Sequence, residues 1–147
     1  MIEVKAKMVA LDQNNHCVVV LTDLEETLML PIWIGLLEAQ SITMELTGEI
    51  PPRPLTHDLF IKLCGETDSA IDKVILTDLT EDIFMAQIHL ICRGKETILD
   101  SRPSDAIALA LRSGAKIYMD EKLMVYTHEP EDFLALEEDE ESGHQIH

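Results

Sequence analysis

The segment from Asp100 to Gly114 restricts what this chain can fold into more than any other. A polar run with one proline precedes an aliphatic stretch, and Gly114 follows that stretch. Pro103 suits the first turn of a helix because its missing N–H would have no partner there, and Asp100 or Ser101 is expected to cap that turn. The aliphatic residues recur on one helical face, and glycine suits the left-handed position after a helix. The pattern predicts a strand end that turns sharply into a buried helix.

Polar side chains crowd the start of this predicted helix. Arg102, Ser104 and Asp105 flank Pro103. Exposed N–H groups and the helix macrodipole attract anions to such a position, so the turn is a candidate site for holding a phosphate. The structural alternative is that Arg102 pairs with Asp105 or Asp100 and only locks the turn.

The remaining sequence predicts an α+β fold. Alternating apolar residues and turn signals predict strands and helices in a definite order. Strands are expected at 2–10, 16–22, 27–30, 73–79, 83–92, 96–99, 116–119 and 123–126, and helices at 36–46 and 57–64 in addition to the proline-led helix. This order resembles two β-hairpin-plus-helix units. Hairpins packed against about three helices give a mixed or antiparallel β-sheet.

Charge is distributed unevenly along the chain. The formal net charge is −17, and residues 129–147 hold eight acids without a single Lys or Arg. We expect one domain over residues 1–136 and a disordered acidic tail over 137–147. An acidic domain argues against a broad basic face for nucleic acid. A small local site that uses a divalent cation is still compatible with this composition.

Cysteine usage and hydropathy predict a cytoplasmic protein. Cys17, Cys64 and Cys92 match no metal-binding spacing, and we expect them to be reduced, buried thiols. No apolar run is long enough to span a membrane, and the first residues lack the layout of a signal peptide.

Three segments, taken in order, resemble one protein family. They read Leu-Pro-Ile-Trp-Ile-Gly at 30–35 leading to Glu-Ala at 38–39, then Pro-Arg-Pro-Leu-Thr-His-Asp-Leu at 52–59 and Asp-Ser-Arg-Pro-Ser-Asp-Ala-Ile-Ala-Leu at 100–109. Together they are similar to the bifunctional nuclease domain, and the resemblance extends over about residues 1–135. It implies a compact α+β domain, commonly a homodimer, with a nuclease activity on both DNA and RNA.

The matched segments contain side chains suited to phosphodiester hydrolysis. That reaction needs an activated water and stabilised phosphate charge, which proteins often supply with carboxylate-held Mg²⁺ or Mn²⁺. A histidine can transfer protons near neutral pH, and an arginine can clamp phosphate oxygens. The candidate catalytic residues are Asp105, His57, Asp58 and Glu38, with Asp105 and Asp58 also as metal ligands, and the candidate phosphate-binding residues are Arg102, Arg53 and Ser104.

Each candidate also has a structural interpretation. Asp105 gains about 0.3–1 kcal/mol merely from its place at a helix start, and His57 and Asp58 are ordinary first-turn residues. The alternative function is a non-catalytic, dimeric binding or regulatory domain that recognises a small anion or a partner protein. The functional hypothesis requires that these distant segments gather beside the helix that begins at Pro103.

Overall fold

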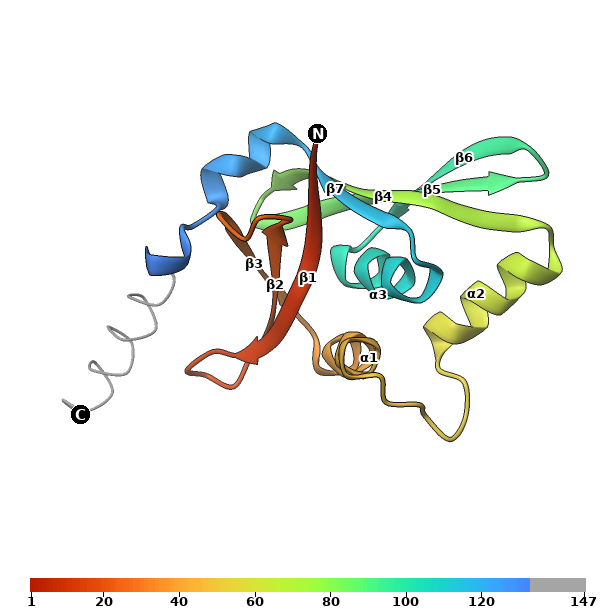
Figure 1. Ribbon diagram of the computed structural model, residues 1–147, viewed down its shortest axis with the longest axis horizontal. Coiled ribbons are helices and arrows are strands. Elements are labelled where there is room, and N and C mark those ends of the chain that lie inside the picture. The colour runs from red at the N-terminus through yellow and green to blue at the C-terminus, as the bar shows by residue number, and fades with distance from the viewer. Residues whose placement is uncertain (133–147) are drawn as a thin grey trace.

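One curled, mixed sheet of seven strands forms the frame of the molecule in the computed structural model, which describes residues 1–132 (Figure 1). Its strand order is β3-β2-β1-β7-β4-β5-β6. The strands are β1 (Ile2–Leu11), β2 (Cys17–Asp23), β3 (Met29–Ile34), β4 (Ser69–Thr80), β5 (Ile83–Cys92), β6 (Lys95–Ser101) and β7 (Lys116–Met119). The helices are α1 (Leu36–Thr47), α2 (Thr56–Glu66), α3 (Pro103–Ser113) and the 3₁₀ helix η1 (Glu121–Tyr126).

The sheet consists of two antiparallel meanders joined by β7. Strands β1, β2 and β3 pair in sequence and lead into α1, while β4, β5 and β6 pair in sequence and lead into α3. Strand β7 is antiparallel to β1 and parallel to β4, which makes the sheet mixed. The predicted α+β fold with two hairpin-plus-helix units is confirmed.

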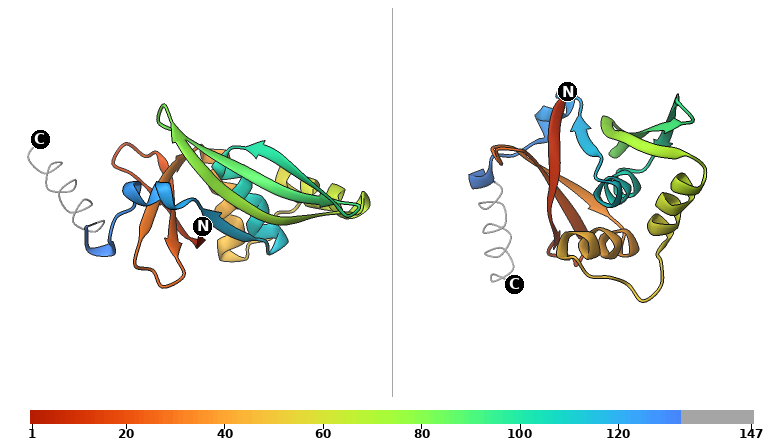
Figure 2. Two further views of the ribbon diagram at one scale, coloured as in Figure 1. Left: turned by 90° about the horizontal axis from the view of Figure 1, so that it is seen from above. Right: turned by 45° about the vertical axis from the view of Figure 1, so that its right-hand side comes forward.

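Helix α3 lies at the centre of the core. It packs against β4, β5, α1 and α2, and Figure 2 shows it enclosed by the curled sheet and the other two helices. Its residues from Ala106 to Ala110 are all buried, and the side chain of Ile107 has no exposed surface. Three of these five residues are alanines, whose small side chains let neighbouring elements approach closely. Helices from both halves of the chain therefore meet along α3.

Strand β3 is longer than the sequence pattern predicted. The predicted strand ended at residue 30, but β3 runs on through Pro31 to Ile34 and pairs with β2. Proline is tolerated because β3 is an edge strand, where one side of the backbone needs no partner. The predicted strand at 123–126 is also wrong. Asp120 accepts a hydrogen bond from the N–H of Lys122 and begins η1 there.

The helix caps differ from the predicted ones. Neither Asp100 nor Ser101 caps α3, whose N-cap is Arg102 in an extended conformation. The Ser101 hydroxyl instead donates to the Arg102 carbonyl over 2.8 Å. The predicted left-handed residue at Gly114 is confirmed by its φ of +74°.

The predicted domain boundary at residue 136 and the predicted acidic tail at 137–147 lie outside the described residues. Within the part that the structure describes, no helix has the length and apolar character needed to cross a membrane.

Candidate functional site

The start of α3 carries an arginine that bridges two carboxylates. Because Arg102 is the N-cap and Asp105 lies three residues later, the arginine side chain folds back over the first turn. Its Nε is 2.9 Å from Asp105 Oδ2, and its Nη2 is 3.2 Å from Asp105 Oδ1. The remaining nitrogen, Nη1, lies 3.0 Å from Oε1 of Glu38 on α1. Arg102 thus ties α3 to α1 through a bidentate and a single ion pair.

His57 joins α2 to the same carboxylate. Its Nε2 is 2.9 Å from Oδ1 of Asp105, and its Nδ1 is 2.7 Å from Oγ of Ser41 on α1. The structure therefore brings together four of the predicted residues, Glu38, His57, Arg102 and Asp105, from three helices. We call these four residues with Ser41 the α3 cluster. Both ring nitrogens of His57 have partners within the cluster, and its role in proton transfer stays a prediction.

Asp105 is held in its charged form by its neighbours. Burial alone would raise the pKa of this carboxyl group, but hydrogen bonds from Arg102 and His57, together with the Arg102 charge, lower it below the ordinary value. The Asp105 carboxylate is thus ionised at neutral pH and acts only as a hydrogen-bond acceptor.

Asp58 belongs to a second cluster beside the first, in which Arg112 on α3 pairs with Asp58 on α2 and lies 3.7 Å from Glu45 on α1. Its Oδ2 accepts the N–H of Leu55 over 2.8 Å at the start of α2, and its Oδ1 accepts from Nε of Arg112 over 2.7 Å. Burial raises the pKa of Asp58, but these two hydrogen bonds outweigh it and lower that pKa. The Arg112 side chain is only 5% exposed and also donates to the carbonyls of Ala108 and Ser41. Asp58 and its sequence neighbour His57 therefore belong to different clusters.

The other two predicted residues are not part of either cluster. Arg53 is exposed in the loop between α1 and α2, and no hydrogen bond or ion pair joins it to another residue in the range 1–132. Ser104 is buried in the first turn of α3, which leaves little of its surface for a ligand. Arg102, with 63% of its side chain exposed, is the most accessible member of the α3 cluster.

The two predicted metal ligands do not form a shared metal site. Among residues 1–132, no group of three His, Cys, Asp or Glu side chains is arranged to hold a metal ion. Asp105 and Asp58 each have both oxygens engaged, and they bind different arginines. Mg²⁺ and Ca²⁺ require free oxygen ligands, so this pair does not fit a divalent ion. Assistance by Mg²⁺ or Mn²⁺ stays a prediction.

The two clusters together are acidic. Four carboxylates against two guanidinium groups leave a formal charge of −2 when His57 is neutral. A phosphate therefore meets repulsion unless a guanidinium group turns toward it. The groups counted are Glu38, Glu45, Asp58 and Asp105 against Arg102 and Arg112.

Sequence reasoning missed Ser41 and Arg112. One face of α1 carries a polar stripe at helical spacing, made by Glu38, Ser41 and Glu45. This stripe is the sequence feature that could have indicated Ser41. Arg112 lies one turn after Ala108 on α3, at the end of the aliphatic run. A contact between this stripe on α1 and an arginine near the end of α3 can be recognised only when the packing of the two helices is known.

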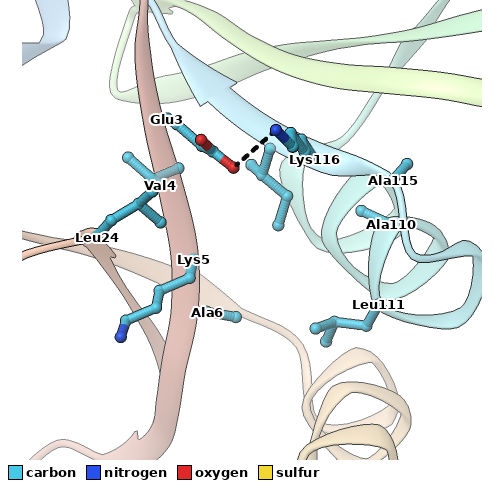
Figure 3. A pocket seen from close by; sticks show the side chains of 10 residues that line it. Glu3, Val4, Lys5, Ala6, Leu24, Ala110, Leu111, Ala115 and Lys116 are labelled. Atoms are coloured by element: carbon cyan, nitrogen blue, oxygen red, sulfur yellow. Dashed lines mark ion pairs between the residues drawn. The ribbon is translucent and has the colours of Figure 1, made fainter.

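A pocket lies toward the other end of α3. Its walls come from β1, β7 and the end of α3, and Figure 3 shows mainly aliphatic side chains around it. The charged groups at its rim include Glu3 and Lys116, which form an ion pair of 4.0 Å. None of the predicted site residues lines this pocket. It is therefore separate from the α3 cluster.

Comparison with known proteins identifies relatives over most of the chain. Residues 19–132 match the family model described as the bifunctional nuclease domain. Two similar proteins are the uncharacterized protein MT1877 from Mycobacterium tuberculosis strain CDC 1551 / Oshkosh and the uncharacterized protein Rv1829 from strain ATCC 25618 / H37Rv. Each is 37% identical over 123 residues, which cover 83% of this chain and 73% of the relative. The matched residues include both clusters.

Proposed function

The chain belongs to the bifunctional nuclease domain family, and we propose on this basis that it hydrolyses phosphodiester bonds in DNA and RNA. The observation that carries the proposal is the α3 cluster. It gathers residues from all three matched segments into one group, namely Glu38, His57 and the pair Arg102 and Asp105, with an exposed guanidinium group beside two carboxylates. Arginine and carboxylate side chains are the groups that phosphodiester hydrolysis uses to hold phosphate and orient water.

Arg102 is the residue we assign to phosphate binding. Its side chain is largely exposed, and the planar guanidinium group binds a phosphate in the same bidentate manner as it binds Asp105. When Arg102 turns to a phosphate, Asp105 Oδ2 and Glu38 lose their cationic partner and become acceptors for a water molecule. His57 keeps its contact with Asp105 Oδ1 in this arrangement. Asp58 and Ser104 have no role in the proposed reaction, and exposed Arg53 is a second phosphate contact.

Cleavage of labelled single-stranded RNA and DNA by the purified full chain tests this proposal. Parallel reactions contain EDTA, Mg²⁺ or Mn²⁺, because metal assistance is a separate question. We expect cleavage by the wild type and a loss of roughly 10²-fold in rate for Asp105→Asn, the size typical of a positioned carboxylate. Asp100→Asn is the matched control, because Asp100 is an exposed residue on the preceding strand.

The outcomes separate the enzyme from the residue assignment. Absence of cleavage by the wild type under every metal condition contradicts the nuclease proposal. Cleavage that is equally fast in Asp105→Asn and the wild type removes Asp105 from the reaction.

The alternative is a non-catalytic domain that binds a small anion or a partner protein. One observation favours it: the charged groups of the α3 cluster are already paired with one another. A binding module predicts that the same labelled oligonucleotides or a small anion change the protein's thermal stability without any cleavage.

We also propose that the chain forms a homodimer through a surface made by Trp33, Leu36 and Leu37. These large apolar side chains lie where β3 leads into α1, and each is more than half exposed. Clustered exposed apolar residues mark interaction sites, and two-fold dimers are the commonest oligomers. Sedimentation equilibrium should show a dimer for the wild type and a monomer for Leu37→Glu. Val125→Glu, at an equally exposed position in η1, should stay dimeric, and a wild type that is monomeric throughout contradicts the proposal.

We propose in addition that the protein is located in the cytoplasm. Cys17, Cys64 and Cys92 are free thiols, and the first two are buried. Unpaired cysteines suit a reducing compartment. Fractionation of cells with an antibody against the chain tests the location.

A further inference from the structure

Ser41 is a buried hydroxyl that serves another helix. It lies in the middle of α1 and is only 4% exposed. A serine within a helix often bonds back to a carbonyl of its own preceding turn, but the Ser41 hydroxyl lies 2.7 Å from Nδ1 of His57 on α2. Its carbonyl accepts a hydrogen bond from Arg112 on α3 over 3.2 Å. The hydroxyl and the carbonyl of Ser41 thus both make contacts between helices.

The direction of the hydrogen bonds through His57 follows from the charge of Asp105. An ionised carboxylate can only accept, so the hydrogen between Asp105 and the ring is carried by Nε2. In a neutral imidazole the other nitrogen, Nδ1, is then an acceptor. The hydroxyl of Ser41 is the donor at that nitrogen. The protons are therefore ordered from Ser41 to His57 to Asp105.

A Ser-His-Asp set is also the pattern of a hydrolytic triad, and the geometry excludes that interpretation here. In a triad the serine contacts Nε2 and the carboxylate contacts Nδ1, whereas the two nitrogens are exchanged in this chain. Ser41 is also buried where a substrate has no access. Ser41 therefore acts through His57 and does not attack a substrate.

We propose that Ser41 is a positioning residue: its hydroxyl donates to Nδ1 of His57 and holds the ring in the tautomer that the Asp105 carboxylate selects. With hydrogen on Nε2, the ring donates to Asp105 Oδ1 and holds this carboxylate beside Arg102. The functional meaning of this role rests on the proposed nuclease activity, because Asp105 is assigned to that reaction. The tautomer itself is independent of any substrate, and it can be measured on the protein alone.

Long-range ¹H–¹⁵N correlation spectra of the ¹⁵N-labelled full chain test the proposal. The spectra are recorded at alkaline pH, where an imidazole is neutral, and His57→Gln identifies the signals of this ring. We expect the pattern of a ring with hydrogen on Nε2 and an acceptor at Nδ1. A ring with hydrogen on Nδ1 overturns the proposal without need of any serine variant.

Variants of Ser41 show whether its hydroxyl holds the His57 ring in this arrangement. Ser41→Ala removes the donor, so the Nδ1 resonance should move toward that of an unbonded nitrogen while the hydrogen stays on Nε2, opposite Asp105. Ser41→Thr keeps a hydroxyl group and should restore the wild-type pattern. Ser113→Ala is the control, because it removes a hydroxyl from the far end of α3, where its partners are the Ala110 carbonyl and the Ala115 N–H.

The results are distinct from those of the cleavage assay. Ring signals that are unchanged in Ser41→Ala overturn the positioning role, whether or not the wild type cleaves nucleic acid. The expected tautomer in a protein that cleaves nothing supports the role of Ser41 and contradicts only the nuclease proposal. If the wild type does cleave, Ser41→Ala should lower the rate and change its pH profile, while Ser113→Ala should change neither.

Discussion

Replacement of Arg112 by methionine should destabilise the protein more than any exposed change near the site. Arg112 is a buried cation that joins all three helices. Its Nε bonds Asp58 on α2, its Nη1 bonds the Ala108 carbonyl on its own helix, and its Nη2 bonds the Ser41 carbonyl on α1. Methionine keeps much of the apolar volume and removes every one of these donors. The substitution therefore tests the polar contacts rather than the packing.

The expected loss follows from how the partners are solvated. Removal of one partner from a fully buried ion pair costs roughly 3–5 kcal/mol. Asp58 is 29% exposed, so water replaces part of the interaction, and the structure supports a loss of about 2–3 kcal/mol in the free energy of unfolding. For a chain of 147 residues, that corresponds to a fall in Tm of roughly 6–10 °C.

Urea denaturation followed by far-ultraviolet circular dichroism measures this loss. Lys62→Met is the matched control, because Lys62 is an exposed cation on α2, and it should change the stability by less than about 0.5 kcal/mol. Arg112→Lys should recover only part of the loss, since an ammonium group cannot reproduce the fork of a guanidinium group. A loss below about 1 kcal/mol for Arg112→Met, with an unchanged m-value, refutes the reasoning.

Two further predictions concern pH and the helix termini. The pKa of Asp105 is lower in the folded state than in an unfolded chain, so its contribution to stability is present above the ordinary pKa of about 3.9 and is lost as the pH falls through the folded value. Asp105→Asn should therefore flatten the fall in unfolding free energy between about pH 5 and pH 3, and an unchanged slope contradicts this assignment. Gly114→Ala should cost about 1 kcal/mol because its φ of +74° is unfavourable for any side chain, whereas Gly65→Ala, inside α2 with open space around an added Cβ atom, should stabilise the protein by about 0.5–1 kcal/mol. Thermal melts of the two glycine variants should move in opposite directions, and shifts of the same sign would contradict the backbone argument.

Local chemistry made several elements predictable. The helix from Pro103 to Ser113 follows from a proline that suits a first turn and a glycine that suits a left-handed end. Strands at 83–92 and 116–119 were predicted with their observed bounds. Each of these signals involves residues within a few positions of one another, so no knowledge of the rest of the fold is needed.

The predictions that were wrong concern features that depend on residues far apart in the sequence. Pro31 lies within a strand because β3 is at the edge of the sheet, and edge position is a property of the whole topology. The helix predicted at 57–64 begins one residue earlier, at Thr56, because the Asp58 carboxylate binds the N–H of Leu55. That carboxylate in turn faces Arg112 from another helix. Contacts between helices thus determine which residue caps α2.

By itself, the sequence determined the fold class, the segments that form the site and the paired Arg102 and Asp105, which are close along one helical turn. Only the tertiary structure decided that His57 would meet Asp105 while Asp58 turned away to Arg112, and that Ser41 would complete the group. Neighbouring residues on a helix point about 100° apart, so their partners depend on how α1 and α2 pack on α3. That packing arises from burial of apolar surface along the whole of α3, and no short stretch of sequence contains it.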